Sequence, residues 1–282
     1  MKNPDQLRSQ ASTFRAMHSG PEMLLLPNAW DVVSARIVEE AGYPAIATTS
    51  GGIAFSLGYP DGQKISPEEM LAVVARIAAA VKVPVTADVE AGYGRSPESA
   101  ARTVRALIEA GAVGMNLEDA TNDSAHPLFE LSLQLEKIHA VREAAAELNV
   151  PVVLNARTDV FLAEVGEASK RYDEVLRRLS AFRDAGADCV FPPGLKDAAV
   201  IGRLVSELKC PVNILAGPGW AAIPELRKLG VARVSLGSGP MRAALGHFRR
   251  TVEELKVSGT YTGLEGAVPY AELNRMLGSS SH

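Results

Sequence analysis

Two carboxylates stand two residues apart in the segment 85–94, Val-Thr-Ala-Asp-Val-Glu-Ala-Gly-Tyr-Gly; they are Asp88 and Glu90. The segment begins as an apolar strand, and residues i and i+2 of a strand point to the same side. We therefore expect both carboxylates to face one space, where like charges repel each other unless a cation lies between them. Oxygen ligands suit a hard divalent cation, so the pair predicts a Mg²⁺ site, with Mn²⁺ as the alternative metal. The competing interpretation is a strand that runs into an exposed acidic turn.

The rest of the chain alternates short apolar strands with helices. The strands lack polar alternation, which is typical of parallel strands buried on both faces, and several helices end at a glycine that favours a left-handed turn. Eight such units predict an α/β fold of the (β/α)₈ TIM barrel type. A doubly wound open sheet is the alternative, but no G-x-G-x-x-G follows the first strand. The expected strands are 24–29, 45–49, the start of 85–94, 113–117, 151–156, 189–193, 211–215 and 232–236.

The segments outside the predicted barrel are short. Residues 1–21 are expected to form an N-terminal helical extension, with an amphipathic helix over 5–18. Residues 22–257 form the predicted catalytic barrel, and 258–282 a C-terminal helix that opens at Pro269-Tyr270 and ends in a flexible tail. Nothing resembles a linker, and 282 residues is near the size of one large barrel.

Polar side chains follow the carboxyl ends of the predicted strands, which form the active-site mouth of such a barrel. The residues that enter the strands are mostly glycine, alanine, valine and proline, so the polarity belongs to one end. Carboxylates converging there with one arginine predict a metal site. The candidates are Ser50, Gly51, Gly52 and Asp61 after the second strand, Asp88 and Glu90 in the third, Glu118 and Asp119 after the fourth, Arg157 after the fifth and Asn213 in the seventh.

Several candidates have a second interpretation. Arg157 either clamps a substrate carboxylate held by the metal or only balances a neighbouring carboxylate. Segment 50–52 either presents backbone N–H groups to a carboxylate or is a plain turn. Asp119 and Asp159 are equally suited to cap the helices that follow them. His126, in the loop after the fourth strand, is a candidate acid or base, although a loop histidine is often merely solvated.

Composition excludes several classes of protein. The net charge is −4, and no basic run or aromatic-interleaved patch indicates a nucleic-acid partner. No apolar run reaches the ~18 residues of a membrane span, and the N-terminus lacks the apolar core of a signal peptide. The only two cysteines, Cys189 and Cys210, lie in or beside apolar runs and are expected to be buried thiols. We therefore expect a cytoplasmic protein without nucleic-acid or membrane partners.

Five motifs occur in order along the chain: Thr49-Ser50-Gly51-Gly52, Leu57-Gly58-Tyr59-Pro60-Asp61, the segment 88–94, Leu117-Glu118-Asp119 and Asn155-Ala156-Arg157-Thr158-Asp159. With them the chain resembles the isocitrate lyase / phosphoenolpyruvate mutase superfamily over about residues 22–256. The D-x-[DE]-x-G-Y-G and L-E-D motifs are specific when they occur together.

The resemblance implies a Mg²⁺-dependent barrel that acts on 2-oxo acids or their enolates. It implies a homo-oligomer, a dimer or tetramer, in which the helix over 239–256 is exchanged with a neighbouring subunit. The implied metal site has Asp88 as direct ligand, with Asp61, Glu90 and Glu118 holding the waters of the metal. The expected substrate-binding residues are Ser50, Gly51, Gly52, Arg157 and Asn213, and the expected catalytic residues are Asp61, Arg157 and His126.

Departures from the family pattern narrow the reaction. Lyases of this superfamily carry a K-[KR]-C-G-H loop after L-E-D, whereas residues 120–127 here contain neither cysteine nor lysine. The glutamate of their F-P-E motif is replaced by Pro193. These gaps argue against isocitrate or methylisocitrate cleavage and favour a lyase of a small, oxaloacetate-like 2-oxo acid. The alternatives are a C–P bond enzyme of the mutase or phosphonopyruvate hydrolase type, and a barrel that binds 2-oxo acids without turnover.

Overall fold

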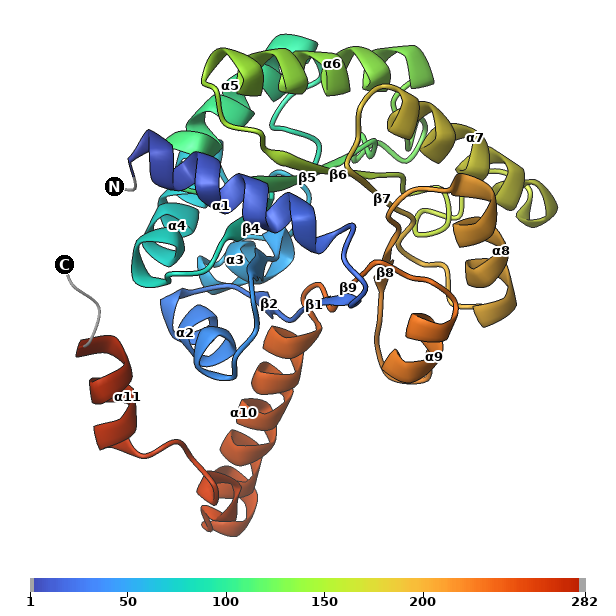
Figure 1. Cartoon of the computed structure of the whole chain (residues 1–282). Coiled ribbons are helices and arrows are strands. Elements are labelled where there is room, and N and C mark those ends of the chain that lie inside the picture. The colour runs from blue at the N-terminus through green and yellow to red at the C-terminus, as the bar shows by residue number, and fades with distance from the viewer. Residues whose placement is uncertain (1–2, 279–282) are drawn as a thin grey trace.

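The computed structural model describes residues 3–278 and shows a (β/α)₈ barrel, as predicted (Figure 1). Pro27 divides the first predicted strand in two, because proline has no N–H to donate to a ladder. Each other predicted strand is present, with its ends shifted by one or two residues. The strands are β1 (Leu24–Leu26), β2 (Asn28–Ala29), β3 (Ile46–Thr48), β4 (Val85–Asp88), β5 (Gly114–Glu118), β6 (Val153–Arg157), β7 (Cys189–Phe191), β8 (Asn213–Leu215) and β9 (Arg233–Ser235).

The strands pair in parallel and in chain order, in two sheets that together go round the barrel. One sheet has the order β2-β3-β4-β5-β6-β7 and the other β1-β9-β8. The sheets meet where β1 continues into β2 and where a single parallel bridge joins Val190 to Val212. The order never reverses, so the doubly wound alternative is wrong, since that fold requires a reversal point.

Helices follow the strands and cover the outside of the barrel (Figure 1). Asp31 and Ser66 begin α2 and α4, each with a capping box. The helices are α1 (Pro4–Met17), α2 (Val32–Glu40), α3 (Ser50–Ser56), α4 (Pro67–Ala80), α5 (Pro97–Glu109), α6 (Leu131–Glu147), α7 (Arg171–Asp184), α8 (Ala198–Leu208), α9 (Ile223–Lys228), α10 (Gly239–Ser258) and α11 (Tyr270–Gly278).

One helix was not predicted. Segment 50–52 after β3 was expected to be a plain turn or a backbone site for a carboxylate, but residues 50–56 form α3. Thr49 begins this helix, and its side chain accepts from the N–H of Gly52. Ser50 therefore occupies the first turn of a helix, with its N–H directed outward from the helix start.

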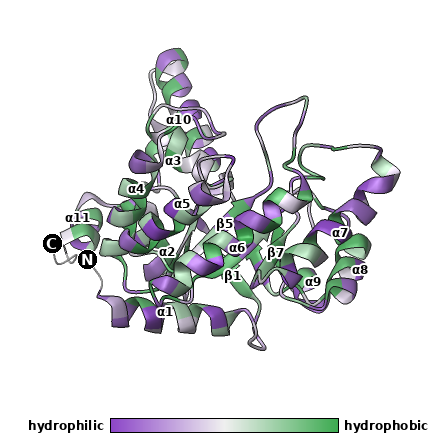
Figure 2. Ribbon diagram, turned by 90° about the horizontal axis from the view of Figure 1, so that it is seen from above, coloured by the Kyte–Doolittle hydropathy of each residue, from purple (hydrophilic) through white to green (hydrophobic). Residues whose placement is uncertain are grey.

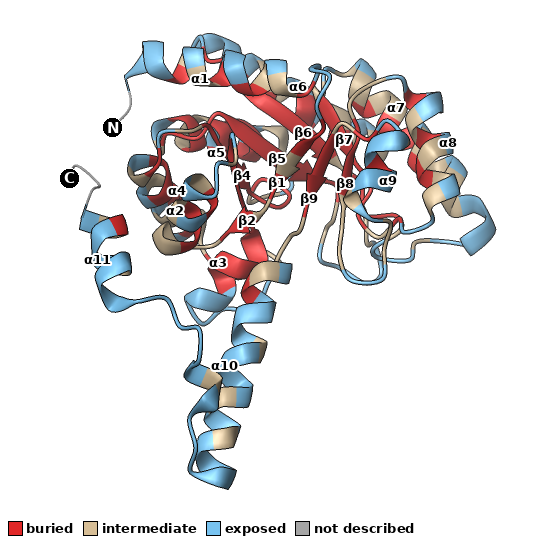
Figure 3. Ribbon diagram, turned by 60° about the horizontal axis from the view of Figure 1, so that its bottom comes forward, coloured by how far each residue is buried: buried red, intermediate tan, exposed pale blue. Residues whose placement is uncertain are grey.

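The N-terminal extension closes the end of the barrel opposite the active-site mouth. Phe14 of α1 is fully buried against the start of β5, where Gly114 leaves room for it. A Cβ on Gly114 would lie 2.7 Å from the Phe14 ring and 2.7 Å from the Thr86 hydroxyl. The core lies inside the barrel and between the strands and helices (Figure 3).

The helix that follows the last strand does not lie against the barrel along its length. Figures 2 and 3 show α10 projecting from the body of the molecule. Of its twenty residues, all within the described part of the chain, only Met241 is buried. The chain then returns to α11, where Arg275 lies 3.6 Å from Glu40 of α2. The predicted tail beyond residue 278 lies outside the described residues, and no helix within 3–278 is long and apolar enough to span a membrane.

Candidate active site

Two rows of interior side chains line the barrel at the carboxyl ends of β4, β5 and β6. Register pairs Asp88 with Asn116 and Asn116 with Asn155, and it pairs Glu118 with Arg157 two residues further on. Paired residues of parallel strands point to the same face, as do residues i and i+2. The predicted metal residues Asp88 and Glu118 and the predicted substrate residue Arg157 are therefore brought to one mouth.

Asp88 has one carboxylate oxygen held and the other free. The N–H and the hydroxyl of Ser50 both donate to Asp88 Oδ2, at 3.2 and 3.0 Å. The backbone N–H of Asp88 donates to Thr48 Oγ1 at 3.0 Å. Asp88 Oδ1 is buried and has no hydrogen-bond partner among the described residues. A buried carboxylate oxygen without a hydrogen-bond partner needs a cation or an ordered water.

Glu90 reaches the same place by another route than the one predicted. β4 ends at Asp88, and Glu90 has a left-handed backbone with φ +50°, so the strand alternation does not apply to it. Its side chain is buried, and Glu90 Oε1 has no partner within the described chain. Burial, followed by the charges of Asp61 and Asp88, raises the pKa of Glu90 to about 8.

The other two predicted metal residues complete an acidic cluster. Asp61 is exposed at the mouth, and its carboxylate lies so near Gly51 that a Cβ there would be 3.0 Å from Asp61 Oδ2. Although the residue as a whole is exposed, its carboxyl group is partly buried. This burial, and then the charge of Asp88, raise the pKa of Asp61. Burial raises the pKa of Glu118 well above its usual range, against the opposing effect of Arg157. Such mutual destabilisation of ionised carboxylates is relieved when a cation binds.

The cluster fits a magnesium ion that keeps most of its waters. Within the described range, no three His, Cys, Asp or Glu side chains are close enough together to ligate one ion directly. At most two such side chains in that range can therefore ligate one ion directly, which is compatible with a Mg²⁺ site where neighbouring carboxylates hold bound waters. The unpartnered oxygen of Asp88 is available as a direct ligand, and the unpartnered oxygen of Glu90 is available to accept a hydrogen bond from a bound water.

Arg157 is held between two carboxylates. Its Nη1 lies 2.8 Å from Glu118 Oε2, while its Nε and Nη2 donate to Asp159 at 2.5 and 2.7 Å. Both interpretations of the sequence are therefore compatible with the contacts, since the guanidinium balances charge and also faces the mouth. Neither Asp119 nor Asp159 caps a helix: α6 begins at Glu130 and α7 after Lys170, both without a side-chain cap.

Lys137 is a site residue that the sequence analysis missed. It is fully buried on α6, and its ammonium group donates to the carbonyls of Ala91 and Gly94 at 2.6 and 3.2 Å. It thereby holds the turn that contains Tyr93, another left-handed residue with φ +52°. Burial lowers the pKa of Lys137 to about 8. No spacing within the helix sequence distinguishes this lysine from a solvated one.

Two predicted residues lie apart from the cluster. His126 is exposed and lines a separate groove of about 780 Å³ with residues such as Phe129, Arg171 and Arg178. Asn213 is fully buried at the start of β8, where it exchanges hydrogen bonds with Ser235 at 3.2 and 3.3 Å. Neither contacts another predicted site residue in the hydrogen bonds of the described chain.

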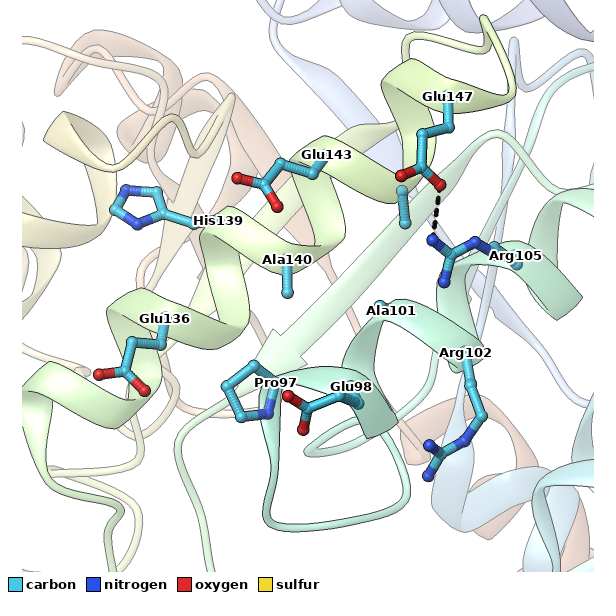
Figure 4. A pocket seen from close by; sticks show the side chains of 11 residues that line it. Pro97, Glu98, Ala101, Arg102, Arg105, Glu136, His139, Ala140, Glu143 and Glu147 are labelled. Carbon is cyan, nitrogen blue, oxygen red and sulfur yellow. Dashed lines mark hydrogen bonds and ion pairs between the residues drawn. The ribbon is translucent and has the colours of Figure 1, made fainter.

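His139 lies on the outside of the barrel. Figure 4 shows it on α6, beside the groove between α5 and α6. The groove is crossed by an ion pair of 2.6 Å between Arg105 and Glu147.

The raised pKa of Glu90 predicts that Mg²⁺ binding tightens as pH rises through about 8, because the bound ion favours ionised Glu90. Stability of the metal-free protein should change in the opposite direction. Because the pKa of Glu90 in the folded protein lies above the ordinary 4.5, its contribution to stability is fully present below pH 4.5. This contribution is lost as pH rises from 4.5 to about 8. Calorimetric titration with Mg²⁺ and thermal unfolding, both from pH 5 to 9, measure the two effects. A Mg²⁺ dissociation constant that does not vary with pH would contradict the prediction.

Comparisons with known proteins agree with this geometry. Residues 14–256 match the family model described as phosphoenolpyruvate phosphomutase. The chain is 36% identical over 269 residues to an uncharacterized protein of Mycobacterium tuberculosis (strain CDC 1551 / Oshkosh), covering 94% of this chain and 96% of that one.

Solved structures extend the comparison. A protein of Burkholderia cenocepacia J2315, provisionally named a lyase/mutase, is 41% identical with a TM-score of 0.90, and 96% of each chain is covered. An oxaloacetate acetylhydrolase solved with the inhibitor 3,3-difluorooxalacetate is 27% identical with a TM-score of 0.85, covering 96% of this chain and 93% of that one. The chain therefore belongs to the phosphoenolpyruvate phosphomutase family, within the phosphoenolpyruvate mutase / isocitrate lyase superfamily of lyases and mutases.

Proposed function

We propose that the protein is a cytoplasmic, Mg²⁺-dependent lyase that breaks a C–C bond of a small, oxaloacetate-like 2-oxo acid. The observation that carries the proposal is the state of Asp88, which has one oxygen held by Ser50 and the other buried and free beside three further carboxylates. The inhibitor complex of the related oxaloacetate acetylhydrolase supports this class of substrate.

Each residue of the site has a role in this proposal. Asp88 would hold the ion, and Asp61, Glu90 and Glu118 would hold its waters. When bound, Mg²⁺ supplies Lewis-acid stabilisation of the enolate charge that develops as the bond breaks. Arg157 binds the substrate carboxylate, and Gly51 lets the Asp61 carboxylate approach the first turn of α3, since a Cβ there would lie 3.0 Å from Asp61 Oδ2. A water or His126 supplies the proton, His126 only if the loop that carries it moves over the mouth.

C–P bond chemistry is the second candidate, and one contact favours it. Asn122 in the loop after β5 reaches the loop after β3, since a Cβ on Gly62 would lie 3.1 Å from Asn122 Oδ1. An amide beside Asp61 could bind a phosphoryl oxygen. Binding without turnover is the third candidate, supported by the absence of a cysteine from the loop 120–127.

Titration of metal-stripped protein with oxaloacetate, 2-oxoglutarate, pyruvate and phosphonopyruvate, each with and without Mg²⁺, tests the proposal. We expect Mg²⁺-dependent binding of oxaloacetate and formation of pyruvate or of another product of C–C bond cleavage. A phosphorus-containing product seen by ³¹P NMR would establish the second candidate instead. Metal-dependent binding without any product would establish the third.

We also propose that the protein is a homo-oligomer, a dimer or tetramer that exchanges α10. Exposed apolar residues recur on α10 at spacings of three and four, which is one face of a helix. A contiguous apolar face of this kind is characteristic of an interface. The residues of this face are Leu245, Phe248, Val252 and Leu255.

Phe248→Glu is expected to reduce the oligomer toward the 29.9 kDa monomer, because it places a charge within the proposed interface. Light scattering after size-exclusion chromatography measures the mass. Arg249→Glu is the matched control, since Arg249 is the next residue and lies outside the apolar face. A wild-type mass of one chain would refute the proposed exchange.

A further inference from the structure

Asp119 and Arg178 form a buried ion pair beneath the active site. Asp119 is fully buried and the Arg178 side chain is 9% exposed, with Nη1 of the arginine 3.1 Å from Asp119 Oδ2. The same Nη1 donates to the carbonyl of Phe129 at 3.0 Å, and Nε donates to Glu174 at 2.7 Å. Arg178 thus joins α7 to the loop that follows β5.

The other hydrogen bonds of Asp119 join it to Arg157 at the end of β6 and to the two residues that follow. Its Oδ2 accepts from the Thr158 hydroxyl at 2.6 Å, and its Oδ1 accepts from the backbone N–H of Asp159 at 2.9 Å. Its own N–H donates to the carbonyl of Arg157 at 3.1 Å. One aspartate therefore positions three consecutive residues, the last of β6 and the two that follow it.

Asp159 in turn determines where the Arg157 guanidinium lies. Its carboxylate takes Nε and Nη2 in a bidentate contact, while Glu118 takes Nη1 from the other side. A shift of the backbone at Asp159 would break this bidentate contact and leave the guanidinium with the Glu118 contact alone. Bidentate contacts depend strongly on such geometry.

We propose that the Asp119–Arg178 pair is a positioning device that aims Arg157 at the carboxylate of the substrate. The inference rests on the proposed function of Arg157 and assigns roles to two residues that touch neither metal nor substrate. It differs from a purely structural role in one respect. A structural pair stabilises the fold without affecting ligand affinity in the folded protein, whereas a positioning pair sets that affinity.

The experiment measures three quantities for each variant: the thermal midpoint, the dissociation constant of Mg²⁺ alone, and that of oxalate at saturating Mg²⁺. Oxalate serves as the probe because it is a planar dicarboxylate of the size of a 2-oxo acid head. The main variant is Arg178→Met, which keeps an unbranched apolar side chain and removes the charged guanidinium. Arg177→Met is the matched control, since Arg177 also pairs with Glu174, at 2.7 Å, but its side chain is 53% exposed.

We expect Arg178→Met to weaken oxalate binding about 10- to 100-fold, the range seen when partners of a site residue are removed. Mg²⁺ alone should bind within about threefold of wild type, because Asp88 and Glu90 keep their contacts. Arg177→Met should match wild type in all three quantities. Arg178→Lys, which restores the charge facing Asp119, should recover part of the oxalate affinity and remains informative if Arg178→Met fails to fold.

The outcomes separate the inference from the proposed function. Wild-type protein that binds no oxalate in the presence of Mg²⁺ would overturn the proposed function. Wild-type binding with unchanged oxalate affinity in a folded Arg178→Met or Arg178→Lys variant, even with a lower thermal midpoint, would overturn the positioning role alone. Equal losses of Mg²⁺ and oxalate affinity would also overturn it, because they would indicate a general collapse of the site.

Discussion

Asp88→Asn is expected to abolish Mg²⁺ binding and the activity that depends on it. The amide keeps the shape of the side chain, so Ser50 can still donate to its oxygen. The other position becomes an uncharged NH₂ group where the buried free oxygen stands in the native protein. Loss of the metal removes several kcal/mol of charge stabilisation, which corresponds to about 10³-fold or more in rate.

Titration of the metal-stripped variant with Mg²⁺, together with turnover at saturating Mg²⁺, measures this loss. Asp184→Asn is a suitable control, since Asp184 is an exposed carboxylate paired with Arg183 far from the mouth. Unfolding of Asp88→Asn should remain cooperative, because the variant removes a charge from a crowded acidic cluster. A variant that retains a normal Mg²⁺ response would exclude Asp88 as the direct ligand.

Arg157→Met is expected to weaken binding of the substrate carboxylate by about 2–5 kcal/mol, the cost of losing one partner of a buried charge pair. The variant should also lose stability, because Glu118 and Asp159 remain buried without the cation that both contact. Arg157→Lys keeps the charge but cannot contact both carboxylates as a planar fork does. We expect it to recover stability more fully than affinity.

The measurement is the dissociation constant of oxalate at saturating Mg²⁺, together with the thermal midpoint of each variant. A loss of stability with unchanged oxalate affinity would show that Arg157 only balances charge. That result would support the second interpretation of the residue and remove it from the substrate site.

The order of elements could be predicted from the sequence because its signals are local. Apolar runs without alternation indicate parallel strands, and Asp31 and Ser66 sit where capping boxes begin helices. The acidic mouth followed from the same reasoning, since parallel strands of a barrel bring their carboxyl ends together. On that basis Asp88, Glu118 and Arg157 were expected at one mouth, and the register of β4, β5 and β6 brings them together there.

The reasoning failed where the backbone leaves regular structure. Glu90 was assigned the alternation of a strand that ends two residues before it, and its left-handed φ is set by the turn that Lys137 holds. Segment 50–52 was expected to be a plain turn or a backbone site for a carboxylate, and two glycines in succession are unfavourable in a helix. Its helix is stabilised by the buried environment and by the contact of Ser50 with Asp88.

By itself the sequence determined the barrel, its acidic mouth and the family to which its motifs belong, since each depends on residues close together in the chain. Tertiary structure alone decided which side chains support the site. Lys137 and Arg178 lie 46 and 59 residues from the partners they hold, Ala91 and Asp119. No spacing pattern encodes such contacts, because a buried cation is stabilised only by carbonyls and carboxylates that folding brings to it.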